Sequence, residues 1–161
     1  MERQYTAAVI TVSDRCSRGE QEDTSGPAVA ALMRDNGYEV VSAVIVPDEE
    51  DQIAAEMIRC ADVLHADIIL ATGGTGFSPR DVTPEATRRV IERETPYIPF
   101  AMVSASLRIT PRAMLTRMTA GIRGGSLILN LPGSKKAAIE NLSSVVGTLD
   151  HALQMLAGGG H

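Results

Sequence analysis

Residues 67–76 read DIILATGGTG, an apolar run that passes directly into a loop of glycines and threonines. The run at 67–71 is typical of a buried strand, because its apolar residues are consecutive rather than alternating. The glycines permit φ > 0 and a close approach of the backbone to a ligand, and successive N–H groups form a concavity that binds anions. A tight strand-to-helix turn without any ligand explains the same residues equally well, so both interpretations stand at this point.

Three further apolar runs extend this pattern along the chain. Residues 5–12 (YTAAVITV), 38–46 (YEVVSAVIV) and 126–131 (SLILNL) predict strands. Start signals and helical spacing predict helices over 24–37, 52–65, 83–93, 96–108 and 135–156, whereas 111–125 has no clear pattern. Apolar strands that alternate with helices predict a three-layer α/β/α domain with a mostly parallel sheet covered on both faces. We expect one domain over residues 1–157 and a disordered tail over 158–161.

The composition is that of an ordinary globular chain, with 44% hydrophobic and 22% charged residues among 161. The net charge of −5 argues against a nucleic-acid partner, because domains that bind nucleic acids carry a basic face. No apolar stretch approaches the roughly 18–20 residues that span a bilayer, and no signal peptide is recognisable. Cys16 and Cys60 have the spacing of neither a zinc site nor a redox pair, which favours a reducing cytoplasm.

Hydroxyls, carboxylates and cations follow the four predicted strands. Ligands of open parallel sheets bind beyond the carboxyl ends of the strands, so residues in these loops are expected to share one edge. They are Ser13 and Asp14, then Asp48, then the glycine loop with Arg80 and Asp81, and finally Pro132, Gly133, Ser134 and Lys135. This combination suits a metal–nucleotide site. The glycine loop has neither the GxxxxGKS/T nor the GxGxxG spacing, so it is neither of those nucleotide-binding motifs.

Asp48 and Asp81 are the candidate metal ligands of this edge. Each has a simpler explanation when taken alone. Asp81 stands just before a helix start at Thr83, where the helix dipole favours a carboxylate, and Asp48 is a polar residue solvated after a strand. Together they supply hard oxygen ligands beside a phosphate site, and such ligands suit Mg²⁺.

Residues 72–87 (TGGTGFSPRDVTPEAT) closely resemble the signature of the molybdenum cofactor biosynthesis family that includes MogA and MoaB. Residues 12–27, 94–117 and 120–137 resemble further blocks of that family, so the likeness covers nearly the whole chain in order. One departure is Lys135, which stands where family members often have a proline after the Pro-Gly-Ser turn. The additional cation is suited to holding a phosphate.

The resemblance implies a nucleotidyltransferase that transfers AMP from Mg-ATP to the terminal phosphate of molybdopterin and releases pyrophosphate. It implies that Asp81 and Asp48 are the catalytic and metal-binding residues. The implied nucleotide-binding residues are Gly73, Gly74, Thr75, Gly76, Pro132, Gly133 and Ser134. The implied substrate-binding residues are Ser13, Asp14, Arg80, Ser106, Asn130 and Lys135.

The resemblance also implies partners and leaves rival functions. The expected assembly is a homotrimer or a hexamer, with transient contact to a molybdenum insertion protein. One rival is a non-catalytic, MoaB-like molybdopterin-binding protein, and a second is a trimeric interaction module. Without the resemblance, the residues predict an α/β protein that binds some phosphorylated ligand.

Overall fold

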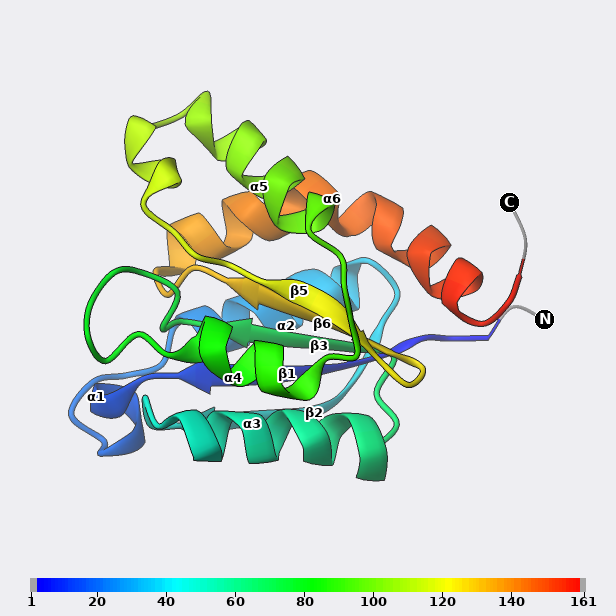
Figure 1. Cartoon of the computed structure of the whole chain (residues 1–161), viewed down its shortest axis with the longest axis horizontal. Helices are drawn as coiled ribbons and strands as arrows, with labels where there is room; N and C mark the ends of the chain where they lie inside the picture. Colours follow the sequence, from blue (N-terminus) through cyan, green and yellow to red (C-terminus); the bar gives the residue numbers. More distant parts are fainter. Residues whose placement is uncertain (1–2, 160–161) are drawn as a thin grey trace.

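Six strands form one sheet in the order β2-β1-β3-β6-β5-β4 in the computed structural model, which describes residues 3–159 (Figure 1). The four predicted strands are confirmed as β1, β2, β3 and β6, and they run parallel. Two short strands that the sequence did not predict, β4 and β5, complete the sheet in antiparallel orientation. The bounds are Thr6–Val12 for β1, Glu39–Val46 for β2, Ile68–Thr72 for β3, Arg93–Glu94 for β4, Ala120–Arg123 for β5 and Ser126–Leu131 for β6.

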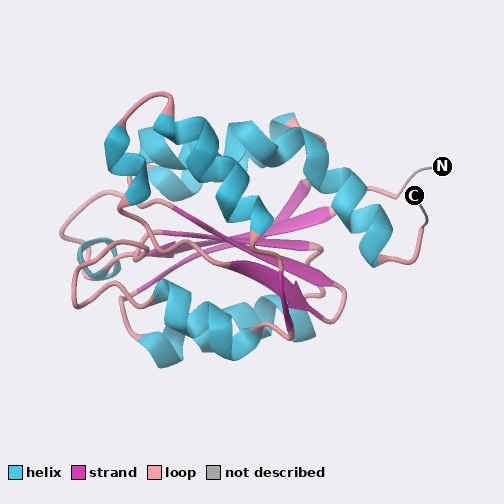
Figure 2. Ribbon diagram, turned by 45° about the horizontal axis from the view of Figure 1, so that its top comes forward, coloured by secondary structure: helices cyan, strands magenta, loops and turns pink. Residues whose placement is uncertain are grey.

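Helices cover both faces of the sheet, which confirms the three-layer prediction (Figure 2). One apolar cluster joins the sheet to α2 (Ser25–Asp35), α5 (Tyr97–Leu107) and α6 (Lys135–Leu156). A second joins the opposite face to α3 (Glu50–Ile58), a π-helical turn (Arg59–Val63) and α4 (Thr83–Val90). Aliphatic residues and methionines dominate both clusters, as the low aromatic content requires. Within residues 3–159, none of the helices combines the length and the hydropathy needed to traverse a bilayer.

The strand β2 departs from the prediction that both faces of every strand are covered. Its residues alternate between exposed and half-buried, and Val41 and Ile45 are 39% and 43% exposed. The reason is its position, because β2 forms an edge of the sheet while β1, β3 and β6 lie inside it. Apolar residues at consecutive positions therefore identified the strand but not its degree of burial.

The segment 111–125 holds the largest difference between sequence and structure. A 3-10 turn (Pro111–Met114) leads to β5, which pairs with β4, and α4 accordingly ends at Val90 rather than at residue 93. Gly121 permits the pairing, because a Cβ atom there would lie 2.6 Å from the Arg93 carbonyl oxygen. The predicted polar loop after β1 likewise contains one short helix, α1 (Asp14–Ser17), whose first turn is capped by Ser13.

The carboxyl ends of all four parallel strands meet at one edge, where α1 and the loop between β3 and α4 lie (left in Figure 1). At the opposite edge α6 ends, and the N–H groups of Gly158 and Gly159 donate to the carbonyls of Met155 and Gln154. The rest of the predicted tail, residues 160–161, lies outside the described residues.

Asn130 in β6 is a buried polar hub behind this edge. Its side chain is 0% exposed and donates to the Thr87 hydroxyl at 2.9 Å, while its carbonyl oxygen accepts the Thr119 N–H at 3.0 Å. These bonds tie a central strand to α4 and to the residue that precedes β5.

Replacing Asn130 with alanine leaves the buried Thr119 N–H without a partner. It also removes the donor to the Thr87 hydroxyl, which keeps its own bond to the Thr83 carbonyl. We expect the free energy of unfolding to fall by about 2–3 kcal/mol, measured by urea denaturation. The control is Asn36→Ala, because the exposed Asn36 amide donates only to a carbonyl at the end of its own helix. Its loss is expected to stay within about 0.5 kcal/mol. Equal losses in the two variants would contradict this role of Asn130.

Candidate functional site

The glycine loop is packed too closely to accept any other residue at its first two positions. Gly73 and Gly74 have φ of 108° and 67°, in the region that favours glycine. A Cβ atom on Gly73 would overlap the Val12 carbonyl oxygen, and one on Gly74 would overlap the Thr83 hydroxyl. That hydroxyl donates to the Gly73 carbonyl at 2.8 Å and fixes the loop against the start of α4.

Three consecutive N–H groups of this loop are available to a ligand. The Gly73 N–H donates to the Leu131 carbonyl at 3.0 Å, but those of Gly74, Thr75 and Gly76 form no hydrogen bond to any part of the chain that the structure describes. Successive N–H groups without partners form an anion-binding concavity. This observation favours a phosphate-binding loop over a turn that serves only to connect β3 and α4.

The turn after β6 lies beside the glycine loop and opens the longest helix. A Cβ atom on Gly133 would lie 3.4 Å from the Cα atom of Gly73. The Ser25 hydroxyl donates to the Gly133 carbonyl at 2.6 Å, and the Ser134 hydroxyl caps α6 by accepting the Ala137 N–H at 3.2 Å. The positive end of a 22-residue helix therefore lies next to the free N–H groups, and the helix dipole favours anions there.

Carboxylates from three loops gather on the other side of the glycine loop. Asp14 and Asp48 bond reciprocally: the Asp14 N–H donates to the Asp48 carboxylate at 2.8 Å, and the Asp48 N–H donates back at 2.9 Å. Asp48 and Asp81 both overlie the glycines. A Cβ atom on Gly74 would lie 3.1 Å from Asp48 Oδ1, and one on Gly76 would lie 2.9 Å from Asp81 Oδ2.

Arg80 is the cation of this group. Its guanidinium donates to both oxygens of Asp14, at 2.9 and 3.0 Å, and to Glu49 at 3.0 Å. The hydrogen bonds from Arg80 hold the pKa of Asp14 below its ordinary value. Burial raises the pKa of Asp48, and the nearby charges of Asp14 and Asp81 add to that effect. The edge thus carries more carboxylates than Arg80 alone can offset.

This chemistry fits a magnesium ion that is shared with a substrate. Within residues 3–159, no cluster of three or more acidic, histidine or cysteine side chains is arranged to hold a metal by itself. Magnesium commonly binds through one or two carboxylates, with substrate phosphates and water completing its shell. The half-buried Asp48 and the neighbouring Asp81 supply such a pair beside the free loop N–H groups.

A cavity of about 340 Å³ adjoins the glycine loop on the side of α5 and α6. Four predicted residues line it: Thr75, Ser106, Pro132 and Ser134. Ser106 is 7% exposed, and its hydroxyl has no hydrogen-bond partner among the described residues. The cavity therefore combines a mainly apolar wall with a buried polar group that a ligand can satisfy.

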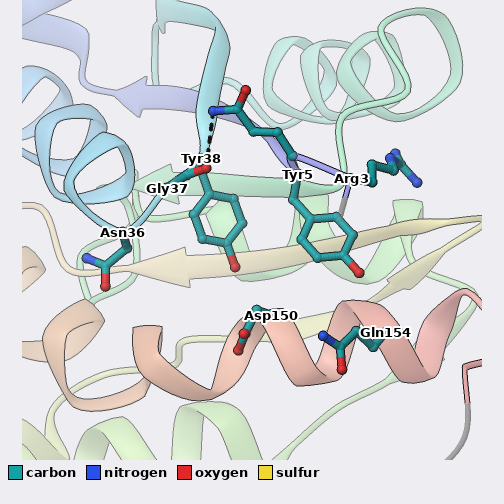
Figure 3. Close-up of a pocket in the computed structure, with 8 residues that line it drawn as sticks. Arg3, Tyr5, Asn36, Gly37, Tyr38, Asp150 and Gln154 are labelled. Atoms are coloured by element: carbon teal, nitrogen blue, oxygen red, sulfur yellow. Dashed lines mark hydrogen bonds between the residues drawn. The ribbon is translucent and has the colours of Figure 1, made fainter. Parts of the chain in front are cut away.

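A second cavity, of about 310 Å³, lies at the opposite edge of the sheet (Figure 3). Tyr38 and Tyr5 point from the amino ends of β2 and β1 towards Asp150 and Gln154 on α6, respectively. Burial raises the pKa of Tyr38 to about 12. No residue of the predicted site lines this cavity, and none of the strand-end loops reaches it.

The structure brings together most residues that the sequence singled out, but not all of them. The acidic loops assemble Ser13, Asp14, Asp48, Arg80 and Asp81 around the glycines, and Lys135 lies exposed at the first position of α6. Asn130 is fully buried with its amide bonded inside the fold, so it presents no atom to either cavity. Direct substrate contact by Asn130 therefore has no geometric support.

Sequence reasoning missed Arg117, whose guanidinium contacts the loop at Gly76 and Asp81. It lies in the segment 111–125, where no periodicity placed any residue near the site. Glu49, which bonds Arg80, directly follows the candidate ligand Asp48 in the chain but was not singled out from the sequence.

The fold and this edge define an α/β protein whose candidate anion-binding loop lies beyond the ends of its parallel strands. The family model described as a probable molybdopterin binding domain matches residues 8–151, and the chain belongs to that family. This confirms the resemblance first seen in residues 72–87.

Individual relatives agree with this membership. The chain is 43% identical over 152 residues to the molybdenum cofactor synthesis protein cinnamon of Drosophila melanogaster, covering 94% of this chain but only 25% of that protein. It is 39% identical over 153 residues to the molybdopterin adenylyltransferase of Helicobacter pylori, covering 93% of this chain and 86% of that one. The crystal structure of the molybdopterin biosynthesis enzyme MoaB from Thermus thermophilus superimposes with a TM-score of 0.91 at 44% identity, covering 96% and 98% of the two chains.

The raised pKa of Asp48 predicts a cost in stability at neutral pH. The folded chain holds this proton to a higher pH than the unfolded chain, so the free energy of unfolding falls as pH rises through the raised pKa. Asp48→Asn removes that loss and keeps an oxygen that accepts the Asp14 N–H. We expect its Tm at neutral pH to exceed that of the wild type by about 1–4 °C, measured by differential scanning fluorimetry.

The advantage of Asp48→Asn should shrink as pH falls below the pKa of Asp48, because the wild-type carboxyl is then neutral as well. Asp35→Asn, at the exposed end of α2, serves as the control and should show no such dependence on pH. A Tm of Asp48→Asn below that of the wild type at neutral pH would contradict the prediction.

Proposed function

We propose that this protein is a molybdopterin adenylyltransferase, which transfers AMP from Mg-ATP to the terminal phosphate of molybdopterin. The observation that carries the proposal is the row of free N–H groups at Gly74, Thr75 and Gly76, overlaid by the carboxylates of Asp48 and Asp81. Family membership supports a role in molybdenum cofactor biosynthesis, and the Helicobacter pylori relative carries the name of this activity.

The proposed reaction joins two anions. An oxygen of the pterin's terminal phosphate forms a bond to the α-phosphorus of ATP, and the bond from that phosphorus to the bridging oxygen breaks, so pyrophosphate leaves. The attacking oxygen is already anionic, so no general base is needed. Catalysis then depends on in-line positioning and on neutralising the phosphate charge.

Different residues of the edge would bind the phosphates, neutralise their charge and hold the loops in place. The free loop N–H groups and the positive end of α6 face the region where phosphates would bind. Arg80, with Lys135 at the start of α6, adds positive charge. Asp48 and Asp81 would hold magnesium, which when bound offsets charge on the ATP oxygens. Arg80 reaches Asp14 and Glu49 across the edge and so holds the loops of β1, β2 and β3 together.

The cavity beside the loop is suited to the pterin. It lies next to the phosphate-binding groups, so a ring seated there would point its phosphate towards them. Its wall includes Met118 and Leu115, and the unpartnered Ser106 hydroxyl offers one hydrogen bond to a heterocycle edge. Such a mainly apolar cavity with few polar groups is typical of a small-molecule site.

The alternative within the same family is a protein that binds molybdopterin without transferring AMP. The chain resembles a MoaB structure as closely as it resembles proteins named for the transferase. Both acidic positions are present here, and a pterin-binding protein has no need of a second, magnesium-ready phosphate site. Incubation with molybdopterin, ATP and Mg²⁺ separates the two, because only the enzyme releases pyrophosphate.

We also propose that the chain forms a homotrimer through the outer face of α5. This helix is apolar on both faces, and its outward residues Tyr97, Phe100 and Leu107 are 77%, 64% and 44% exposed. The rings of Tyr97 and Phe100 pack edge to face with centroids 6.0 Å apart, which makes one continuous patch. An apolar patch of this kind on a surface helix marks an interaction site.

Asp81→Asn should remove most of the activity while the fold persists, since asparagine still accepts the Ser78 N–H that bonds Asp81 at 3.0 Å. We expect kcat for AMP transfer to fall about 100-fold or more, because a neutral amide is a poor ligand for magnesium. The measurement is chromatography of adenylylated molybdopterin together with pyrophosphate release.

Asp150→Asn is the matched control, because that acid lies on α6 at the opposite edge of the sheet. It should keep the wild-type rate. Turnover by Asp81→Asn within about twofold of wild type would rule out the role of Asp81.

Phe100→Asp should dissociate the assembly, because it places a charge in the centre of the apolar patch. Light scattering after gel filtration should give the mass of three 17.1 kDa chains for wild type and of one for the variant. Val63→Asp, at a 67% exposed position on the other side of the sheet, should remain assembled. A wild-type chain that elutes as a monomer at micromolar concentration would overturn the proposal.

A further inference from the structure

We propose that Arg117 is the positioning residue that holds Asp81 in place, an inference that rests on the proposed function. Its guanidinium donates through Nε to the Gly76 carbonyl at 2.9 Å and through Nη2 to the Asp81 carbonyl at 2.6 Å. One planar group thus fastens both ends of the segment 76–81. The Arg117 N–H also donates to the Thr75 carbonyl at 2.8 Å, so backbone and side chain hold the same loop.

Glu85 fixes the direction of this arginine. Nη1 and Nη2 of Arg117 reach the two carboxylate oxygens of Glu85 at 2.6 and 3.2 Å. Glu85 lies in the first turn of α4, the helix that follows the segment. A two-point contact between a guanidinium and a carboxylate specifies orientation as well as charge. Arg117 is therefore held in the one direction from which it reaches both carbonyls.

Apart from Arg117, the segment between the two fastened carbonyls is tied to the protein through the side chain of Arg80, which bonds Asp14 and Glu49. The Asp81 N–H donates to the Ser78 carbonyl at 2.9 Å, and the Ser78 N–H donates to the Asp81 carboxylate at 3.0 Å, but both bonds lie within the segment. Among residues 3–159, no side chain from outside the segment other than that of Arg117 bonds to its main chain. The internal bonds orient the Asp81 carboxylate relative to its own turn, and Arg117 fixes the main chain of that turn at both ends, whereas Arg80 ties it only through a side chain.

Arg117 also stands between the two halves of the site. Thr116 and Met118, on either side of it, line the cavity assigned to the pterin, whereas the side chain of Arg117 contacts the segment of Asp81. Loss of the guanidinium should therefore weaken metal binding and slow the transfer of AMP. The cavity walls at Thr116 and Met118 would stay in place, so molybdopterin binding should persist. Loss of an ion pair that only stabilises the fold would not lower metal binding and transfer while leaving molybdopterin binding unchanged.

The test compares Arg117→Met with Arg123→Met. Arg123 is a matched control because its guanidinium likewise joins a carboxylate, Asp62, to a backbone carbonyl, that of Val90, at similar exposure and away from the site. Both variants should lose a similar amount of thermal stability. Arg117→Lys keeps the charge but reaches only one carbonyl, so it should fall between wild type and Arg117→Met, and it replaces the methionine variant if that one does not fold.

The measurements are amide hydrogen exchange at Ser78 and Asp81, Mn²⁺ binding with an α,β-methylene analogue of ATP, and steady-state kinetics. Arg117→Met should exchange these amides about 10-fold faster, bind Mn²⁺ about 10-fold more weakly and lower kcat at least about 10-fold. KM for molybdopterin should stay within about twofold of wild type. Arg123→Met should change none of these.

Exchange, Mn²⁺ affinity and kcat within about twofold of wild type in folded Arg117→Met or Arg117→Lys would overturn the inference. So would equal changes in Arg123→Met, because the effect would then follow stability alone. If the wild-type chain lacks AMP transfer, the proposed function fails. The exchange and Mn²⁺ measurements still decide whether Arg117 positions Asp81.

Discussion

The site depends on the contact between the glycine loop and the end of the first strand. Gly73 lies so close to the Val12 carbonyl that no side chain fits, and the Thr83 hydroxyl closes the loop from the other side. The backbone has positive φ at Gly73 and Gly74, and the three N–H groups that follow Gly73 are left without partners in the described chain. Parallel pairing of β1 with β3 and of β3 with β6 brings the acidic loops and the start of α6 to the same place.

An acidic chain can bind anions here because positive potential is concentrated locally. Most of it comes from main-chain N–H groups and from a helix terminus, which add no net charge to the protein. The carboxylates concentrate negative potential instead. Asp48 is half-buried beside two other acids, so its charged form is unfavourable. A cation bound beside Asp48, as in the proposed function, would offset this unfavourable charge.

Sequence predicted the parallel core and the gathering of polar loops at one edge, because both follow from local patterns. Runs of apolar residues marked β1, β3 and β6, and the polar residues that follow them had to meet at one edge of a parallel sheet. Residues 111–125 resisted prediction because β4 and β5 are short strands that exist only through pairing with each other and with β6. Arg117 enters the site through that pairing, and no local signal could place it. Asn130 was singled out only through the resemblance, and its place as a buried hydrogen-bonding hub depends on Thr87 and Thr119, which no local pattern connects to it.

The two ends of the described chain lie at the edge of the sheet opposite to the site (Figure 1). Arg3 stands near the amino ends of β1 and β2, and α6 ends on the same side, so neither end passes the glycine loop. A reporter protein or an affinity handle fused to either end would project away from the phosphate-binding loops. The domain can therefore be immobilised by either end for single-molecule or surface-based assays with its ligand entrance facing free solution.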